Sequence, residues 1–115
     1  MRRGDIRLVD LEPIRGGEAN KRRPAVLVSN DHANSRAVAL GRGVLTVVPV
    51  TSSTSRVFPF QVLLPADETG LRLDSKAQAE QVRAVALERI GPPLGQVPLR
   101  LMRQIDDALR LHLQL

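Results

Sequence analysis

Residues 21–31, KRRPAVLVSND, contribute more to the predicted fold than any other stretch. Their apolar part, Ala25–Val28, is a continuous run of strand-forming residues and predicts a central strand of a sheet. Pro24 restricts Arg23 before it to extended backbone, so the guanidinium is aimed rather than loose. Asn30 follows with chemistry typical of a turn or a helix cap. The stretch predicts a buried strand with an aimed arginine at its start, and a solvated basic loop with an edge proline is the alternative.

Alternation and turn residues outside this stretch predict four more strands. These are expected at Asp5–Leu11, Val44–Val50, Phe58–Leu64 and Ala77–Val85. Pro49 interrupts the ladder near the end of one strand, and Pro65 ends another. The connecting segments are expected as a loop over residues 13–23, a polar loop at Ser52–Arg56 and a short turn at Asp67–Leu71.

The last segment, from Pro98 onward, changes period. Apolar residues recur there at steps of three and four, as Leu101, Met102, Ile105, Ala108, Leu109 and Leu113. This spacing predicts an amphipathic helix with a proline near its start. Five or more short strands and one terminal helix place the fold in the mainly β class, as a small antiparallel barrel closed by a helix.

Length and composition narrow the possible classes of protein. The chain has 115 residues, which suits one domain with a single core, predicted over residues 1–115. It has no cysteine, so a disulfide framework, a zinc finger and a catalytic thiol are excluded. No apolar run approaches the roughly 20 residues of a membrane span, and the N-terminus leads into no signal-type apolar segment. A cytoplasmic domain without membrane contact is expected.

Basic residues are concentrated near the predicted central strand. The 17 basic residues outnumber the 12 acidic ones, and all but Lys21 and Lys76 are arginines. Arginine in place of lysine is typical of a GC-rich genome, but guanidinium groups also match phosphate geometry. Arg15, Lys21 and Arg22 crowd together with Arg23, and Glu18 is the one acid among them. The sequence therefore predicts a local basic loop.

Most catalytic chemistries lack their residues in this chain. His32 follows the central strand in a predicted solvated turn, and His112 lies on the apolar stripe of the last helix, where a packed or interface role is expected. No His, Asp or Glu cluster has metal-ligand spacing, so no metal or cofactor is expected. Gly41-Arg42-Gly43 lacks the Lys-Ser/Thr of a phosphate-binding P-loop. Phe58 and Phe60 are the only aromatic residues, which leaves few platforms for base stacking.

Five blocks in sequence order resemble the MazF/PemK toxins of bacterial toxin–antitoxin systems. The matching blocks are residues 3–13 with Arg3-Gly4-Asp5-Ile6, residues 17–31 with Gly17-Glu18, Lys21 and Arg23-Pro24, residues 48–52 (VPVTS), residues 59–64 (PFQVLL) and residues 80–85 (EQVRAV). One block alone is weak, but five in the same order cover nearly the whole chain and make a specific match.

This resemblance implies a fold and an activity. The implied fold is the small SH3-like antiparallel barrel of the CcdB/PemK plasmid-maintenance toxins, working as a homodimer. The implied activity is metal-independent, sequence-selective cleavage of single-stranded RNA, mainly mRNA, which leaves 2′,3′-cyclic phosphate and 5′-hydroxyl ends and arrests growth. The residues proposed for catalysis in the family correspond to Arg23 and Thr51. The resemblance also implies a cognate acidic antitoxin, MazE-like, whose flexible peptide masks the basic groove.

The implied chemistry suits these residue types. Attack of a ribose 2′-hydroxyl on the neighbouring phosphate needs charge neutralisation on the phosphorane and proton transfer, but no metal. Arg23 suits phosphorane binding, and its very high pKa makes it a poor general base. Thr51 suits donation to a nonbridging oxygen, with a strand-end threonine satisfying a turn as the alternative. Candidates for RNA binding or for shaping the site are Glu18, Lys21, Arg22, Asn30, Ser52, Arg56, Ser75, Glu80, Gln81 and Arg83.

Two other functions fit the same predicted barrel. One is a non-enzymatic CcdB-like toxin that binds DNA gyrase, and the other is a basic RNA-binding barrel that leaves RNA intact. The loop before Pro24 together with Thr51 favours the nuclease. If Glu80 lies close to Arg23, it is expected to orient the guanidinium or accept a proton.

Overall fold

The computed structural model describes residues 1–11 and 22–115. The strands in this part of the chain are β1 (Asp5–Asp10), β2 (Arg22–Leu27), β3 (Val44–Thr51), β4 (Gln61–Leu64), β5 (Ser75–Gln78), β6 (Arg83–Ala86) and β7 (Ile90–Gln96). The helices are α1 (Asp31–Leu40), α2 (Ala66–Thr69) and α3 (Leu99–Leu113), with short 3-10 turns η1 (Ala79–Gln81) and η2 (Leu87–Arg89).

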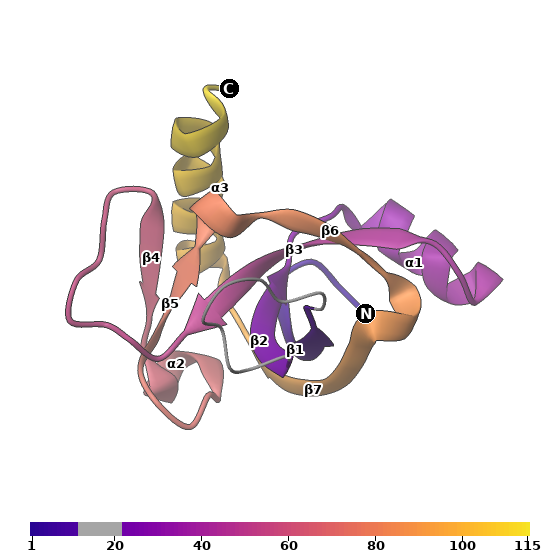
Figure 1. Cartoon of the computed structure of the whole chain (residues 1–115), viewed down its shortest axis with the longest axis horizontal. Coiled ribbons are helices and arrows are strands. Elements are labelled where there is room, and N and C mark those ends of the chain that lie inside the picture. Colours follow the sequence, from indigo (N-terminus) through magenta and orange to yellow (C-terminus); the bar gives the residue numbers. More distant parts are fainter. Residues whose placement is uncertain (12–21) are drawn as a thin grey trace.

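The strands form one antiparallel sheet that curls on itself. Its order is β4-β5-β3-β2-β1-β7, and β6 pairs with β3 beside this path. Figure 1 shows α3 standing against the β4–β5 side, while α1 lies at the opposite end of the molecule. The mainly β class with a C-terminal helix is therefore confirmed, as is the central place of β2, which lies between β1 and β3.

Two apolar clusters explain why the run in β2 is continuous rather than alternating. Val26 joins a cluster that includes Ile6, Val48 and the buried face of α3. Its neighbours Ala25 and Leu27 point the other way, into a second cluster around Leu45 and Val47. A strand buried on both faces reads as an unbroken apolar run. Burying a side chain such as Val26 or Leu27 contributes about 1.5–3 kcal/mol.

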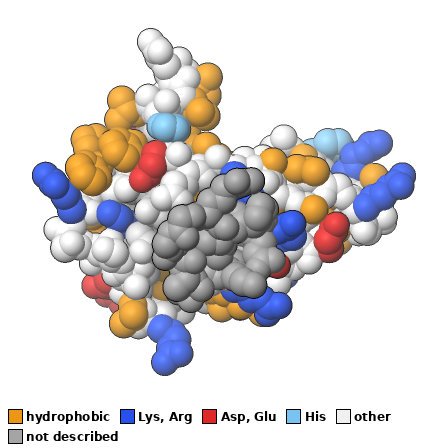
Figure 2. All heavy atoms as spheres, viewed as in Figure 1, with side chains coloured by type: hydrophobic (Ala, Val, Ile, Leu, Met, Phe, Trp, Pro, Cys, Tyr) orange, Lys and Arg blue, Asp and Glu red, His pale blue; other side chains and the backbone are white. Residues whose placement is uncertain are grey.

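Charged side chains surround these clusters. In Figure 2, Lys and Arg side chains are spread over both ends of the visible face rather than gathered in one patch. The predicted basic loop falls largely within residues 12–21, so that prediction lies mostly outside the described residues.

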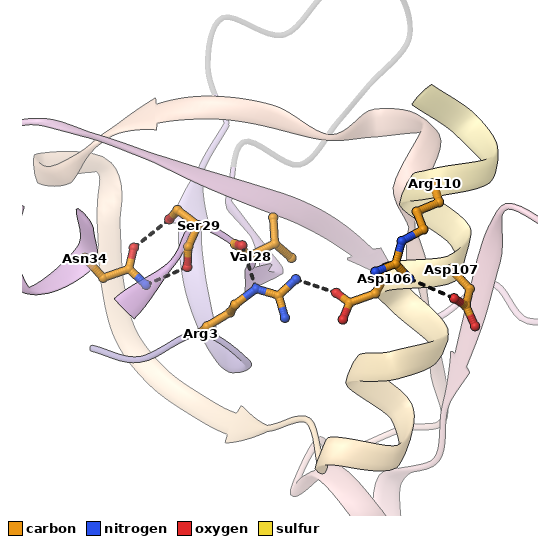
Figure 3. A network of polar contacts seen from close by, with 7 residues as sticks. All are labelled: Arg3, Val28, Ser29, Asn34, Asp106, Asp107 and Arg110. Atoms are coloured by element: carbon orange, nitrogen blue, oxygen red, sulfur yellow. Dashed lines mark hydrogen bonds and ion pairs between the residues drawn. The ribbon is translucent and has the colours of Figure 1, made fainter. Parts of the chain in front are cut away.

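Arg3 ties the N-terminus to α3 (Figure 3). Its Nε donates a hydrogen bond to the carbonyl oxygen of Val28 at 2.8 Å, and its Nη2 forms an ion pair with Asp106 of α3. Its backbone N–H donates to Asp31 at the start of α1, 2.6 Å away. One arginine thus links the chain's start, the end of β2 and two helices.

Two predicted strands differ from the observed elements. Phe58–Phe60 lie outside β4, which begins only at Gln61, because a turn joins the Phe58 carbonyl to the Gln61 N–H at 2.8 Å. The predicted strand Ala77–Val85 is broken by η1, which separates β5 from β6. The break sends the chain from β5, which pairs with the end of β3, to β6, which pairs with its beginning.

Strand β7 was not predicted, because Ile90–Gln96 (IGPPLGQ) has two prolines, two glycines and no alternation. It is an edge strand of the sheet path, where proline is tolerated. Its glycines allow close approach. A Cβ on Gly95 would lie 2.2 Å from the carbonyl oxygen of Thr69, and one on Gly91 would lie 2.7 Å from that of Leu8.

Helix α1 was not predicted either, although its cap was. Asn30 is the N-cap and accepts a hydrogen bond from the Ala33 N–H at 2.8 Å. The predicted solvated turn at His32 is therefore the exposed first turn of a helix. The segment predicted as a turn at Asp67–Leu71 contains most of the short helix α2.

Helix α3 confirms the periodicity of the C-terminal segment, with Pro98 as N-cap and Leu101, Met102, Ile105 and Ala108 buried. His112, however, is exposed in the last turn, so of the packed and interface roles expected for it the packed one is wrong. In the part of the chain that the structure describes, no helix is long and apolar enough to cross a membrane.

Candidate functional site

Arg23 lies near the start of β2, and neutral groups hold its side chain. Its Nη2 donates to Gln78 Oε1 at 2.6 Å and to the carbonyl oxygen of Val50 at 3.3 Å. Both bonds use Nη2, so the three N–H groups on Nε and Nη1 have no acceptor among residues 1–11 and 22–115. The half-buried guanidinium is oriented, and no carboxylate of the described chain neutralises it.

Thr51 projects from the same side of the sheet as Arg23. Val50 and Ala77 pair with each other and face the α3 cluster. Because side chains alternate along a strand, the next residue, Thr51, and its partner Lys76 point to the opposite face. Gln78 shares that face with Lys76, which brings Thr51 and the partner of Arg23 onto one polar surface.

The Thr51 hydroxyl retains a proton to donate. Its Oγ1 accepts a hydrogen bond from the Ser53 N–H at 3.2 Å, so the O–H itself is available to a second group. This contact is the turn-satisfying role considered for Thr51, and it does not compete with donation to a ligand.

A pocket of about 230 Å³ adjoins Thr51. Two predicted residues, Ser52 and Ser75, also line it, and the rest of its wall is mainly apolar. Ser52 is exposed. Ser75 is buried, and its hydroxyl donates to the carbonyl oxygen of Leu73 at 2.9 Å, so that donor is already used.

Glu80 does not meet Arg23. Its Oε2 accepts from Gln61 Nε2 at 2.7 Å, and its Oε1 is buried with no hydrogen-bond partner in the described chain. Glu80 was expected to orient Arg23 or to accept a proton only if it lay close to Arg23, and no contact between the two is found in the described chain. Gln78 orients Arg23 instead, two residues earlier on β5, because η1 carries Glu80 out of the strand. Gln81 is exposed in the same turn.

The remaining candidates are dispersed. Arg83 donates from Nη1 to the carbonyl oxygen of Leu11 at 3.0 Å, which ties β6 to the end of β1. Arg22 lies on the exposed end of β2, beside a hollow of about 150 Å³ that Asp10 and Glu88 also line.

Asn30 caps α1, at the other end of β2 from Arg23. Glu18 and Lys21 lie outside the described residues.

Arg56 lies between β3 and β4 with its guanidinium carbon 5.1 Å from the ring centre of Phe58. Lys76 donates from Nζ to the carbonyl oxygen of Arg56 at 2.6 Å. Among residues 1–11 and 22–115, no three His, Asp or Glu side chains lie together as a metal-binding group.

Gln78 is the functional candidate that the sequence did not single out. Glutamine has no signature of its own, and the pattern around it predicted a strand without saying which partner lies opposite. Its position two residues after Lys76, on the polar face of β5, was the available signal.

Comparisons with known proteins agree with this architecture. Over its full length the chain is 61% identical to endoribonuclease MazF9 of Mycobacterium tuberculosis (strain ATCC 25618 / H37Rv), covering 98% of that protein. It is 30% identical over 113 residues to endoribonuclease MazF6 of the same strain, covering 98% of this chain and 96% of the relative.

Solved structures show the same fold. An endoribonuclease from a mycobacterial species superposes with a TM-score of 0.77 at 23% identity, over 100% of this chain and 92% of the other. An endoribonuclease in complex with its cognate antitoxin, also mycobacterial, gives 0.75 at 24% identity, over 100% and 96%. The CcdB-like alternative is not favoured, because the curated relatives are named endoribonucleases.

Residues 2–113 match the family model described as PemK-like, MazF-like toxin of type II toxin–antitoxin system. The chain therefore belongs to the PemK/MazF family of toxins.

Proposed function

We propose that this chain is a metal-independent, sequence-selective endoribonuclease toxin that cleaves single-stranded RNA, mainly mRNA in the cytoplasm, with Arg23 and Thr51 as its catalytic residues. The observation that carries the proposal is the Arg23 guanidinium, which is oriented by two neutral acceptors and keeps its charge and three donors for a phosphate. Membership of a family whose curated members are named endoribonucleases supports the activity.

The proposed reaction is an intramolecular phosphoryl transfer. The ribose 2′-oxygen attacks the adjacent phosphorus and loses its proton, while the bond from phosphorus to the 5′-oxygen breaks. The 5′-oxygen takes up a proton, so the products are a 2′,3′-cyclic phosphate and a 5′-hydroxyl. Negative charge builds on the nonbridging oxygens in the transition state, where oriented cationic donors stabilise it most.

Arg23 supplies that stabilisation rather than proton transfer. Its guanidinium stays protonated in proteins, which suits charge neutralisation and makes it a poor base. Thr51 donates its hydroxyl proton to a nonbridging oxygen while its Oγ1 keeps the bond from Ser53. Proton transfer is assisted only weakly, since Glu80 turns to Gln61 with its other oxygen buried.

We further propose a homodimer and an acidic antitoxin as partners. Leu111 and Leu113, at the end of α3, are 59% and 48% exposed, and Leu115 just beyond it is 84% exposed, which supports an apolar contact between two copies. The net charge of +5 suits an acidic peptide. Solved relatives are described in complex with a cognate antitoxin, which supports such a partner here.

Cleavage in the absence of metal tests the proposal. Purified protein is incubated with a long unstructured RNA in excess EDTA, beside Arg23→Ala and Thr51→Val, and the fragment ends are mapped. Discrete cuts with cyclic-phosphate ends are expected from the wild-type protein. Arg23→Ala is expected to lose at least about 100-fold in rate and Thr51→Val about 10-fold. Equal melting temperatures of the three proteins serve as the control.

If folded wild-type protein leaves the RNA intact, the proposed nuclease activity is wrong, and binding to DNA gyrase is the next property to test. Unchanged cleavage by Arg23→Ala would support the nuclease activity but would show that Arg23 is not a catalytic residue.

A further inference from the structure

The two aromatic rings of the chain stack on each other at the surface. Phe58 and Phe60 lie parallel, with ring centres 5.4 Å apart and 1° between their planes. Phe58 is 38% exposed, and the Arg56 guanidinium covers it at 5.1 Å. Figure 2 shows hydrophobic side chains gathered over the segment that joins β3 to β4, on the same side of the molecule. An exposed arginine, an exposed ring and a half-buried ring therefore form a stack at the surface.

The framework beneath this stack is firmly anchored. Gln61 holds Phe58 twice, accepting from the Phe58 N–H at 3.1 Å and donating its own N–H to the Phe58 carbonyl at 2.8 Å. Lys76, only 8% exposed, donates to the Arg56 carbonyl oxygen at 2.6 Å. A surface fixed before a ligand arrives loses less conformational entropy on binding. The anchoring therefore lowers the entropic cost of stacking a planar ligand on the rings.

The stack adjoins the surface on which Arg23 and Thr51 lie. Lys76 pairs with Thr51 in the sheet, and Gln78, the partner of Arg23, follows it on the same face of β5. At about 3.3 Å per residue, these two side chains are about 7 Å apart along the strand. A strand of RNA whose phosphate lies at Arg23 can therefore place a neighbouring nucleotide over the loop.

We propose that the Arg56–Phe58–Phe60 stack binds one unpaired nucleobase of the RNA next to the cleaved phosphate. This inference rests on the proposed function. The base takes the place over Phe58 that the Arg56 guanidinium occupies in the free protein. The released guanidinium, which pairs with no carboxylate in the described part of the chain, then contacts the adjacent phosphate. Bases stack on aromatic rings without regard to sequence, so this subsite adds affinity rather than selectivity.

Binding of a non-cleavable RNA tests the stack without relying on catalysis. A single-stranded RNA carrying the mapped recognition word has a 2′-deoxy nucleotide at the cut position, and fluorescence anisotropy measures its Kd. Phe58→Leu keeps an apolar side chain without a ring and is expected to weaken binding about 10-fold. Val57→Ala, at a neighbouring position that is 41% exposed and outside the stack, is the matched control and is expected to bind like wild type.

Abasic substitution identifies the contacted nucleotide. At one position beside the cut, removing the base is expected to weaken wild-type binding about 10-fold and to leave Phe58→Leu binding unchanged. Arg56→Gln is expected to retain that sensitivity and to reduce the slope of log Kd against log salt by about one.

The outcomes separate the two proposals. Wild-type affinity in Phe58→Leu, or equal sensitivity of both proteins at every abasic position, would overturn the subsite while cleavage stands. RNA that binds with the expected Phe58 dependence but is never cut would overturn the nuclease and retain the subsite. Absence of RNA binding by the wild-type protein would overturn both.

Discussion

Two half-buried arginines, Arg3 and Arg23, are held in opposite ways. The guanidinium of Arg3 forms an ion pair with Asp106 and a hydrogen bond to the Val28 carbonyl, so its charge is matched within the fold. Arg23 is held by the Gln78 amide and the Val50 carbonyl, both neutral. One partner is a carboxylate and the other an amide, and that single difference leaves only Arg23 with a charge to offer.

A neutral partner keeps the Arg23 site ready for an anion. A carboxylate would orient Arg23 equally well, but the guanidinium would then have to leave it in order to meet a phosphate. A neutral acceptor orients the guanidinium without an ion pair that must break before the phosphate binds. The contrast predicts that changes at Arg23 act on activity, whereas changes at Arg3 act on stability.

The largest expected effect is that of Arg23→Lys. Lysine keeps the charge but loses the planar fork and its contacts with Gln78 and Val50, so kcat/KM is expected to fall about 100-fold. Arg36→Lys, on the exposed face of α1, is the control and is expected to cleave like wild type. Nearly full activity in the Arg23 variant would contradict binding of the phosphate by several guanidinium donors at once.

A smaller loss is expected when Gln78 is given a charge. Gln78→Glu places a carboxylate against Arg23, and the resulting pair is expected to lower kcat/KM about 10-fold without lowering the free energy of unfolding. Gln78→Met, of similar size and uncharged, separates orientation from neutralisation. If Met impairs cleavage as much as Glu does, orientation alone matters and the comparison with Arg3 loses its meaning.

On the structural side, Arg3→Gln is expected to lower the free energy of unfolding by about 1 kcal/mol. Cleavage per folded molecule should not change. Asp106→Asn should cost a similar amount, and the double variant should cost little more than either single one. Arg110→Gln is the control, because Arg110 and its partner Asp107 are 62% and 77% exposed and such pairs contribute little. Chemical denaturation measures all four, and fully additive losses would show that Arg3 and Asp106 do not cooperate.

The smallest effect concerns pH and Asp5, at the start of β1. Burial raises the pKa of this carboxyl, but hydrogen bonds from the Gln96 side chain and the Arg2 N–H outweigh burial and hold the pKa below its ordinary value of 3.8. A pKa lowered on folding stabilises the protein above that ordinary value, and the stabilisation is lost as pH falls through the folded-state pKa. Asp5→Asn should therefore be less stable than wild type at pH 7, and the gap should narrow towards pH 3. A gap independent of pH would contradict the assignment.

Elements whose burial follows a regular period were predictable from the sequence. In α3 the buried Leu101 and Ile105 are spaced as one helical face requires. In β2, residues 25–27 are continuously apolar because they separate two clusters. Helix α1 buries only Asn34 and Ala37 among its residues, so it has no apolar stripe to detect. Strand β7 is held by its pairing with β1, and a pairing partner is not a property of its own sequence.

Within the site, residue types could be predicted but partners could not. Arg23 stood out because Pro24 follows it and basic neighbours precede it. Its contact with Gln78 depends on residues 55 positions apart meeting across two strands. Glu80, the more conspicuous residue, lies in a local 3-10 turn that interrupts the alternation assumed for the predicted strand Ala77–Val85.

The close approach of Gly95 to the Thr69 carbonyl has an evolutionary consequence. Ile90–Gln96 looks like a linker in which substitutions should accumulate freely, yet at Gly95 no side chain fits, and at Gly91 the Leu8 carbonyl leaves little more room. Leu94 between them is 36% exposed and can drift. Among related sequences, substitutions should therefore be unevenly distributed within β7. Gly91 and Gly95 should change last, and Leu94 should change sooner.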